Sequence, residues 1–266
     1  MDFELKKSYT SSDLVKIMSL LRGEGGCPWD REQTHSSIRD NFIEETLEAV
    51  EAIDNSDVAL LKEELGDVLL QIVFHSQIES EAGSFCFDDV CDGICKKLIF
   101  RHPHIFGDKS ASDSSDVLKI WDEAKRKEKS QSTFAETLEA VPKTFPSLMR
   151  AQKVQKRAAK SGFDYPELSF AWEDLESELD ELSEAIKNKD EENIKEELGD
   201  VLFSVCNVSR LLGLNGEDAL NASTKKFIKR FSLLEEIASK NKIVLESCSL
   251  DELNELWDQA KDILKK

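Results

Sequence analysis

Helix breakers and β-strand patterns are scarce in this sequence. Its 266 residues include five prolines and eleven glycines, and few stretches alternate β-branched with polar residues. That scarcity argues against a β-sandwich or a β-barrel. Apolar residues instead recur at three- and four-residue spacing, which predicts an all-α fold. The predicted helices cover residues 13–21, 36–53, 59–81, 87–100, 117–129, 147–160, 170–187, 191–212, 216–240 and 251–264.

Basic residues are also in short supply. The sequence contains 35 Lys and Arg residues but 54 Asp and Glu residues, which gives a formal net charge of −19. Such a field repels polyanions, so we expect no nucleic-acid polymer as a partner, although metal ions and local basic residues could still admit a small anionic ligand. No apolar run approaches the length of a membrane span, and the first residues lack the apolar core of a signal peptide. We therefore expect a cytoplasmic protein that does not bind membranes.

Cysteine pairs typical of zinc sites are absent too. None of the six cysteines belongs to a C-x-x-C motif. Cys86, Cys91 and Cys95 precede His102 and His104, so a zinc site there is an alternative. We favour reduced thiols that pack as small apolar side chains, which agrees with the expected compartment.

What the sequence does contain is a repeat. The octet KEELGDVL occurs at residues 62–69 and again at 195–202, a displacement of 133 positions in a chain of 266. A repeat at half the chain length indicates two tandem domains. Polar stretches at residues 107–115 and 128–133 predict linkers. We therefore divide the chain into residues 1–130 and 131–266.

The repeat extends to a set of acidic, basic and aromatic positions. Glu45, Glu48, Glu64 and Asp67 correspond to Glu178, Glu181, Glu197 and Asp200, all at the same displacement of 133 residues. Lys97, Arg101 and Trp121 correspond to Lys226, Arg230 and Trp257 at slightly different displacements. Each half therefore carries the same ordered set.

The acidic positions form pairs spaced by three residues, and residues three apart share one face of a helix. A turn at residues 54–57 would lay two such helices antiparallel, so that four carboxylates converge. After Asp67 and Asp200 the chain is apolar nearly all round the helix, which predicts buried helices. Clustered carboxylates repel one another unless a divalent cation binds, and oxygen ligands suit Mg²⁺ or Mn²⁺. The alternative is a solvated acidic surface, in a chain that is about one-fifth acidic.

These patterns resemble the signature of the MazG nucleoside triphosphate pyrophosphohydrolases. The resemblance rests on Glu44-Glu45-x-x-Glu48 with Glu63-Glu64-x-x-Asp67, on Glu178-x-x-Glu181 with Glu196-Glu197-x-x-Asp200, and on the stretches GGCPWD, RHPHIFGD and QKVQKRAAKSGFDYP. It implies two tandem MazG-like helical domains and a homodimer in which helices of both chains build intertwined bundles. It also implies hydrolysis of ribo- and deoxyribonucleoside triphosphates to a monophosphate and pyrophosphate, for nucleotide-pool sanitation or stress-related nucleotide control.

The resemblance also implies roles for individual residues. Glu178, Glu181, Glu197 and Asp200 would hold Mg²⁺ and serve catalysis, and one carboxylate of the set would accept a proton from the attacking water; Glu45, Glu48, Glu64 and Asp67 would bind metal in the first copy. Lys226 and Arg230 would contact phosphates and take part in catalysis, and Trp257 would stack on the base. Two positions depart from the family pattern: Ser177 stands where a glutamate is common, and Thr224 replaces an asparagine.

Both acidic sets are complete, so metal binding does not distinguish the copies. The second copy offers four basic residues in KKFIKRF, whereas the first offers Lys96, Lys97 and Arg101. We therefore expect the second domain to be catalytic and the first to be structural or auxiliary.

Other functional classes need residues that the sequence lacks. A di-iron oxidase needs two Glu-x-x-His pairs, and only residues 32–35 supply one. A Nudix hydrolase needs Arg-Glu where residues 192–193 read Glu-Asn, and the GxxxxGK[ST] loop of a P-loop enzyme does not occur. The alternative function is a non-catalytic helical scaffold or sensor that binds nucleotide and metal without turnover.

Overall fold

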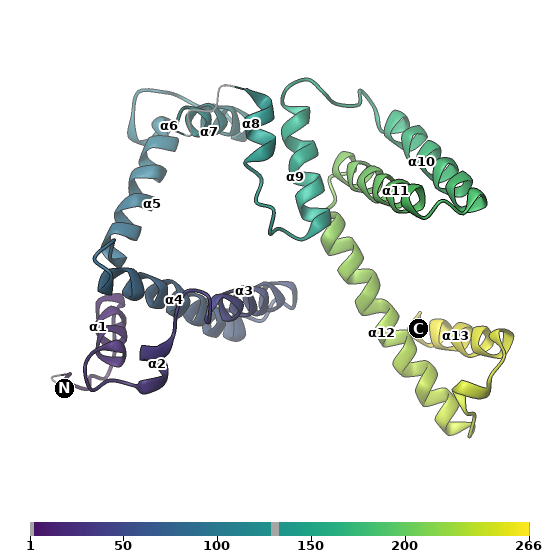
Figure 1. Ribbon diagram of the computed structural model, residues 1–266, viewed down its shortest axis with the longest axis horizontal. Coiled ribbons are helices and arrows are strands. Elements are labelled where there is room, and N and C mark those ends of the chain that lie inside the picture. Colours follow the sequence, from purple (N-terminus) through teal and green to yellow (C-terminus); the bar gives the residue numbers. More distant parts are fainter. Residues whose placement is uncertain (1–2, 129–132, 266) are drawn as a thin grey trace. The chain divides into compact units, whose positions relative to one another are not determined.

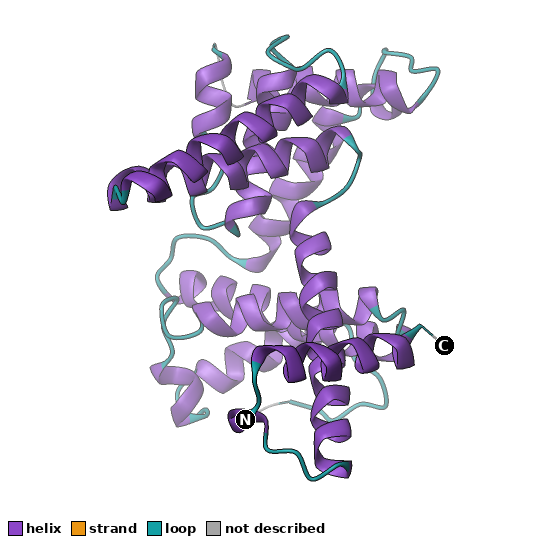
Figure 2. Ribbon diagram, turned by 90° about the vertical axis from the view of Figure 1, so that its right-hand side faces the viewer, coloured by secondary structure: helices purple, strands orange, loops and turns teal. Residues whose placement is uncertain are grey.

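The computed structural model describes residues 3–128 and 133–265. Within these residues the secondary structure consists of helices, turns and loops without a strand (Figure 2). The predicted all-α fold is confirmed. The helices are α1 (Ser11–Arg22), α2 (Pro28–Glu32), α3 (Arg39–Asp54), α4 (Val58–Glu81), α5 (Phe87–Arg101), α6 (Pro103–Phe106), α7 (Ser114–Glu128), α8 (Phe134–Glu139), α9 (Ser147–Ala159), α10 (Leu168–Asn188), α11 (Glu191–Leu211), α12 (Gly216–Lys240), the 3₁₀ turn η1 (Leu245–Ser247) and α13 (Leu250–Leu264).

Each of the ten predicted helices has a counterpart with ends shifted by a few residues. The sequence did not predict α2, α6, α8 or η1, which span three to six residues. Such short elements give no apolar period to detect, and α2 and α6 begin with a proline at the first helical position. The predicted linker at 107–115 corresponds to a loop that ends where α7 begins, while most of the linker at 128–133, the end of the predicted helix 117–129 and the predicted division of the chain near residue 131 lie outside the described residues.

The chain forms two compact units, Met1–Glu128 and Lys129–Lys266 (Figure 1). In the first unit, α4 is the central helix and packs against α1, α3 and α5. Its core contains Met18, Ile38, Val73 and Phe74. The guanidinium of Arg22 donates hydrogen bonds of 2.8 and 2.9 Å to Glu81, which ties the end of α1 to the end of α4.

The turn between α3 and α4 sets the pairing of these two helices. Ser56 adopts a left-handed conformation with φ 55°, and the Asp57 carboxylate caps α4 by accepting hydrogen bonds from the backbone N–H groups of Ala59 and Leu60. The helices then run side by side in opposite directions (Figure 1). The acidic pair of α3 therefore faces the acidic pair of α4.

The second unit repeats this arrangement in α10 and α11. Lys189 takes the left-handed position with φ 57°, and Asp190 caps α11 by accepting from the N–H of Asn193. Helix α9 packs on α11, with the Gln152 amide group bonded to the Cys206 and Leu214 carbonyls and to the N–H of Gly216. The recurring octet thus lies in the first half of the second helix of each pair.

The final helices of the second unit form a separate small core. Helix α13 packs against the C-terminal half of α12 through Leu234, Ala238, Leu256 and Ala260 (Figure 1). This core is distinct from the cluster of Ala171, Leu175, Val201 and Val208 between α10 and α11.

The prediction that the helix after Asp200 is buried on all sides is wrong for the single chain. Leu202 and Phe203 in α11 are 49% and 45% exposed, because the helices packed on α11 cover only part of its circumference. Apolar side chains that one chain leaves exposed in this way are typical of surfaces that pack against another molecule.

Candidate functional site

The first carboxylate cluster forms between α3 and α4. One carboxylate oxygen each of Glu45, Glu48 and Glu64 lies within 4.8 Å of the others. Asp67 does not belong to this closest trio, but its negative charge acts on both Glu45 and Glu64. Burial, followed by repulsion from neighbouring carboxylates, raises the pKa of Glu45 and of Glu64.

A buried amide borders this first cluster. The Gln71 side chain, one helical turn beyond Asp67, is hydrogen-bonded to Glu45. Gln71 is only 7% exposed, and its Oε1 atom is buried without a hydrogen-bond partner. A buried acceptor without a partner is costly in a finished site. It would be satisfied by a water bound to a cation in the cluster.

The second cluster forms in the same way between α10 and α11. Oxygens of Glu178, Glu197 and Asp200 lie within 4.8 Å of one another. Glu181 lies outside the closest trio, and after burial its charge is the strongest influence that raises the pKa of Glu197. Burial and then the charge of Asp200 raise the pKa of Glu178. Ser177, the departure from the family pattern, donates a hydrogen bond of 3.3 Å to Glu181.

Both clusters fit a hard divalent cation. Each brings three carboxylate oxygens together with a fourth acid nearby, and no basic side chain is among the groups that shift the pKa values of Glu178 and Glu197. Oxygen-only sites of this kind are those that Mg²⁺, Mn²⁺ and Ca²⁺ occupy. Burial first, and then the mutual repulsion of the carboxylates, raises the pKa of Glu45, Glu64, Glu178 and Glu197, and a bound cation would relieve that repulsion.

The predicted basic and aromatic residues meet on α12 and α13. The Arg230 guanidinium carbon lies 5.8 Å from the ring centroid of Trp257, and Phe227 packs on that ring at 5.1 Å. Arg230 has a buried Nε without a hydrogen-bond partner, and it forms no ion pair within the described part of the chain. Lys226 is exposed, and the Thr224 hydroxyl donates to the Leu220 carbonyl inside α12.

The single chain does not join this cluster to the carboxylates. No hydrogen bond, ion pair or ring contact among the described residues links Lys226, Arg230 or Trp257 to the α10–α11 cluster. The two sets of predicted site residues belong to the separate cores described above. The structure therefore places the expected residues in two separate groups, the carboxylates between α10 and α11 and the basic and aromatic residues on α12 and α13.

The first unit has the same stacking with a different arginine partner. The guanidinium carbon of Arg101 lies 5.2 Å from the ring centroid of Trp121. The Arg101 Nε and Nη2 atoms both lie 2.7 Å from the same oxygen of Glu128. Arg101 is thus neutralised by an acid at the end of α7, whereas Arg230 is not.

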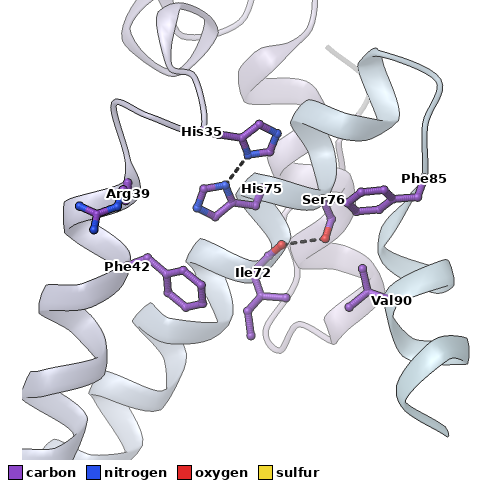
Figure 3. A pocket seen from close by; sticks show the side chains of 8 residues that line it. All are labelled: His35, Arg39, Phe42, Ile72, His75, Ser76, Phe85 and Val90. Carbon is purple, nitrogen blue, oxygen red and sulfur yellow. Dashed lines mark hydrogen bonds between the residues drawn. The ribbon is translucent and has the colours of Figure 1, made fainter. Parts of the chain in front are cut away.

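A pocket that the sequence did not predict is lined by residues of α3, α4 and α5 and of the loops that precede α3 and α5 (Figure 3). It has a volume of about 410 Å³ and an apolar lining that includes Phe42, Ile72 and Phe85. At its edge the Nδ1 atoms of His35 and His75 lie 2.6 Å apart, with the rings stacked at 4.9 Å. The Nε2 of His35 lies 2.7 Å from Glu79.

The histidine pair belongs to the first copy alone. At the displacement of the repeat, Leu168 and Val208 stand in place of His35 and His75. The sequence marks the two histidines only as a difference between the copies, and a comparison that looks for matching positions does not detect a difference.

A comparison with known families agrees with the duplicated geometry. The MazG nucleotide pyrophosphohydrolase domain matches the chain twice, over residues 33–106 and 171–232. The chain belongs to the MazG family. Each matched segment contains one of the two carboxylate clusters, and together they also contain Arg101, Lys226 and Arg230.

Several relatives of this MazG chain cover almost all of it. The nucleoside triphosphate pyrophosphohydrolase/pyrophosphatase MazG of Thermotoga maritima is 43% identical over 249 residues, which are 94% of this chain and 94% of that protein. The nucleoside triphosphate pyrophosphohydrolase of Escherichia coli K12 is 41% identical over 251 residues, 93% of this chain and 95% of that protein. The uncharacterized protein YabN of Bacillus subtilis is 44% identical over 94% of this chain, which corresponds to 51% of YabN.

The matched segments do not include every residue of the expected site. Trp121 and Trp257 lie outside both matched segments.

None of the helices of the described residues is long and apolar enough to cross a membrane.

Proposed function

We propose that this chain hydrolyses ribo- and deoxyribonucleoside triphosphates to a nucleoside monophosphate and pyrophosphate. The observation that carries this proposal is the carboxylate cluster of Glu178, Glu197 and Asp200, whose oxygens lie within 4.8 Å of one another in a MazG domain. Relatives named nucleoside triphosphate pyrophosphohydrolase that align with nearly the whole chain support it.

The metal would be Mg²⁺ or Mn²⁺, held by Glu178, Glu181, Glu197 and Asp200. A bound divalent ion supplies neutralisation of phosphate charge and acidification of water. One carboxylate of the cluster accepts the proton of the attacking water. The first copy binds metal through its own acidic set, Glu45, Glu48, Glu64 and Asp67.

Lys226 and Arg230 bind the phosphates in this proposal, and the partly exposed ring of Trp257 stacks on the base. The Arg230 guanidinium suits this role because its ring contact positions it while its charge has no carboxylate partner among the described residues. Arg101 in the first copy is already paired with Glu128. We therefore assign catalysis to residues 131–266 and an auxiliary role to residues 1–130.

A second chain completes the site. Because one chain keeps its carboxylates and its proposed phosphate-binding residues on different cores, a homodimer would bring the carboxylates of one chain to the phosphate-binding residues of the other. Exposed apolar side chains recur along one stripe of α12, at Leu220, Phe227, Ile228 and Phe231, and along another on α11, at Leu198, Leu202 and Val205. Stripes of this spacing pack against helices, which supports an intertwined helical bundle as the dimer.

The proposed location is the cytoplasm, where the six unpaired cysteines would stay reduced. Hydrolysis of triphosphates to monophosphates there would serve nucleotide-pool sanitation or stress-related nucleotide control.

The first test is a product analysis with individual nucleoside triphosphates and Mg²⁺. Wild type should release pyrophosphate and a monophosphate, and the Glu197→Gln variant should lose this activity. The matched control is Glu64→Gln, the same change at the equivalent position of the first copy, which should retain most of it. Release of phosphate and a diphosphate, or tight binding without turnover, would reject the proposal; the second outcome would favour the scaffold.

Complementation tests the shared site. Glu197→Gln and Arg230→Ala are each expected to be inactive, and mixing them after reversible dissociation should restore roughly a quarter of the wild-type rate, because half of the dimers then carry one intact site. Restoration would require that the two residues act from different chains. A mixture that stays inactive while sedimentation shows mixed dimers would refute the shared site.

A further inference from the structure

The two copies share a stacked arginine and differ in what else the arginine touches. Arg101 lies over Trp121 and Arg230 over Trp257, at 5.2 and 5.8 Å from the ring centroids. In each copy the tryptophan comes from the last helix of the unit, α7 or α13. The ring contact is therefore part of the duplicated design.

The difference lies seven residues after each tryptophan. Glu128 occupies that position in the first copy, and Leu264 occupies it in the second. Two nitrogens of Arg101 converge on one oxygen of Glu128 at 2.7 Å. The side chains of Arg101 and Glu128 are 9% and 31% exposed, so the guanidinium is shielded from water while the carboxylate stays partly accessible. Leu264 offers Arg230 no charge.

A carboxylate and a phosphate compete for the same guanidinium donors. Both present anionic oxygen atoms that accept hydrogen bonds from the arginine N–H groups. A triphosphate that approached Arg101 would first have to displace Glu128. Lys97, by contrast, is exposed, and the first carboxylate cluster has the same trio of oxygens as the second.

We propose that the Glu128 carboxylate occupies the place on Arg101 at which the first copy would otherwise bind a phosphate. This inference rests on the proposed function and deepens it: the first copy is a latent triphosphate site, complete in its carboxylates and closed by one ion pair. The ligand that it would take is the triphosphate moiety of a metal-bound nucleotide. Leu264 leaves the corresponding position of the second copy open.

The decisive variant gives the first copy the residue of the second. Glu128→Leu is introduced into the Glu197→Gln background, in which the second copy is disabled. We expect Mg²⁺-dependent pyrophosphate release at least about tenfold above the Glu197→Gln parent, the effect of freeing one charge-assisted contact. The matched control is Glu123→Leu, because Glu123 lies on the same helix and pairs with Lys109 instead of Arg101. This control should stay at the level of the parent.

A binding measurement makes the test independent of turnover. Inorganic tripolyphosphate with Mg²⁺ serves as the probe, and calorimetry gives the number bound per chain. We expect one for the wild type and two for Glu128→Leu. An unchanged stoichiometry in a folded Glu128→Leu protein would overturn the inference. Absence of pyrophosphate from the wild type would instead reject the proposed function, while the stoichiometry would still decide the role of Glu128.

The reciprocal variant covers the case in which Glu128→Leu does not fold. Leu264→Glu places a carboxylate at the position equivalent to Glu128, seven residues after Trp257, and should raise the KM for triphosphate about tenfold or more with a smaller change in kcat. Leu264→Gln, which has nearly the same shape without the charge, should retain the wild-type KM. If both variants behave alike, charge at this position does not control access to the arginine.

Discussion

Neutralising one acid of the second cluster should have opposite effects on stability without and with metal. The variant is Glu178→Gln, which keeps the shape of the side chain and removes its charge. The Glu178 oxygen lies within 4.8 Å of oxygens of both Glu197 and Asp200. At that separation each pair of like charges costs about 1 kcal/mol even at the dielectric constant of water. Removing Glu178's charge should therefore stabilise the metal-free protein by about 2 kcal/mol.

With metal the order reverses. An ion present at 100 times its Kd stabilises the wild type by about 2.7 kcal/mol, and the variant has lost a ligand and gains little of this. Each kcal/mol corresponds to roughly 4 °C in Tm for a unit of this size. The variant should melt about 8 °C above the wild type in chelator and a few degrees below it in saturating Mg²⁺.

The assay is calorimetry of both proteins at neutral pH in chelator and across a Mg²⁺ titration. Neutral pH matters because the pKa of Glu178 is raised from 4.5. In the folded protein the Glu178 carboxyl therefore stays protonated to a higher pH than a free glutamate, and its repulsion of Glu197 and Asp200 develops only after it has ionised. Asp180→Asn, which removes one exposed charge from the same helix, is the control and should shift both melting curves alike. The reasoning is refuted if Glu178→Gln melts below the wild type in chelator, or if Mg²⁺ stabilises both proteins equally.

Three further predictions concern the framework around the site. The Lys6 ammonium and the Thr10 N–H lower the pKa of Asp13 from 3.8 to about 2, so the stability that this carboxylate contributes is lost as pH falls through that window; acid unfolding of Asp13→Asn should lack this component. Burial and the hydrogen bond to Asp174 raise the pKa of Tyr165 from 10.0 to about 12, so its tyrosinate absorbance should appear well above pH 10 and disappear from the titration in a Tyr165→Phe variant. Arg22→Met should lower the free energy of unfolding, measured in urea, by about 2–3 kcal/mol. This is less than the usual cost of breaking a buried ion pair, because the Glu81 carboxylate is 38% exposed and can rehydrate. An unchanged urea midpoint would contradict this prediction.

The sequence was sufficient for the long helices and for the paired acids. Helices of a dozen residues or more display several apolar periods, and the repeat marked which acids recur at constant spacing. The capping residues Asp57 and Asp190 precede the second helix of each pair and reinforce the antiparallel turns that bring the acids together.

The remaining features depend on packing between distant segments. Arg101 and Glu128 are 27 residues apart, and their ion pair exists because α5 and α7 pack together. The exposure of Leu202 reflects how many helices one chain places around α11, a number that hydropathy alone does not reveal. Periodicity indicates which face is apolar but does not indicate whether the same chain covers it.

The paired imidazoles of the first unit lie close enough to share only one hydrogen. The Nδ1 atoms of His35 and His75 are 2.6 Å apart, and His35 also contacts Glu79 through Nε2. A hydrogen on both Nδ1 atoms would set two N–H groups against each other and force the rings apart. Burial and the neighbouring His35 lower the pKa of His75, so the stability that its neutral form contributes is lost as pH falls below about 6.5. Since His35 precedes α3 and His75 belongs to α4, mild acid should detach the segment that leads into the first carboxylate helix, a change that the imidazole NMR signals would report.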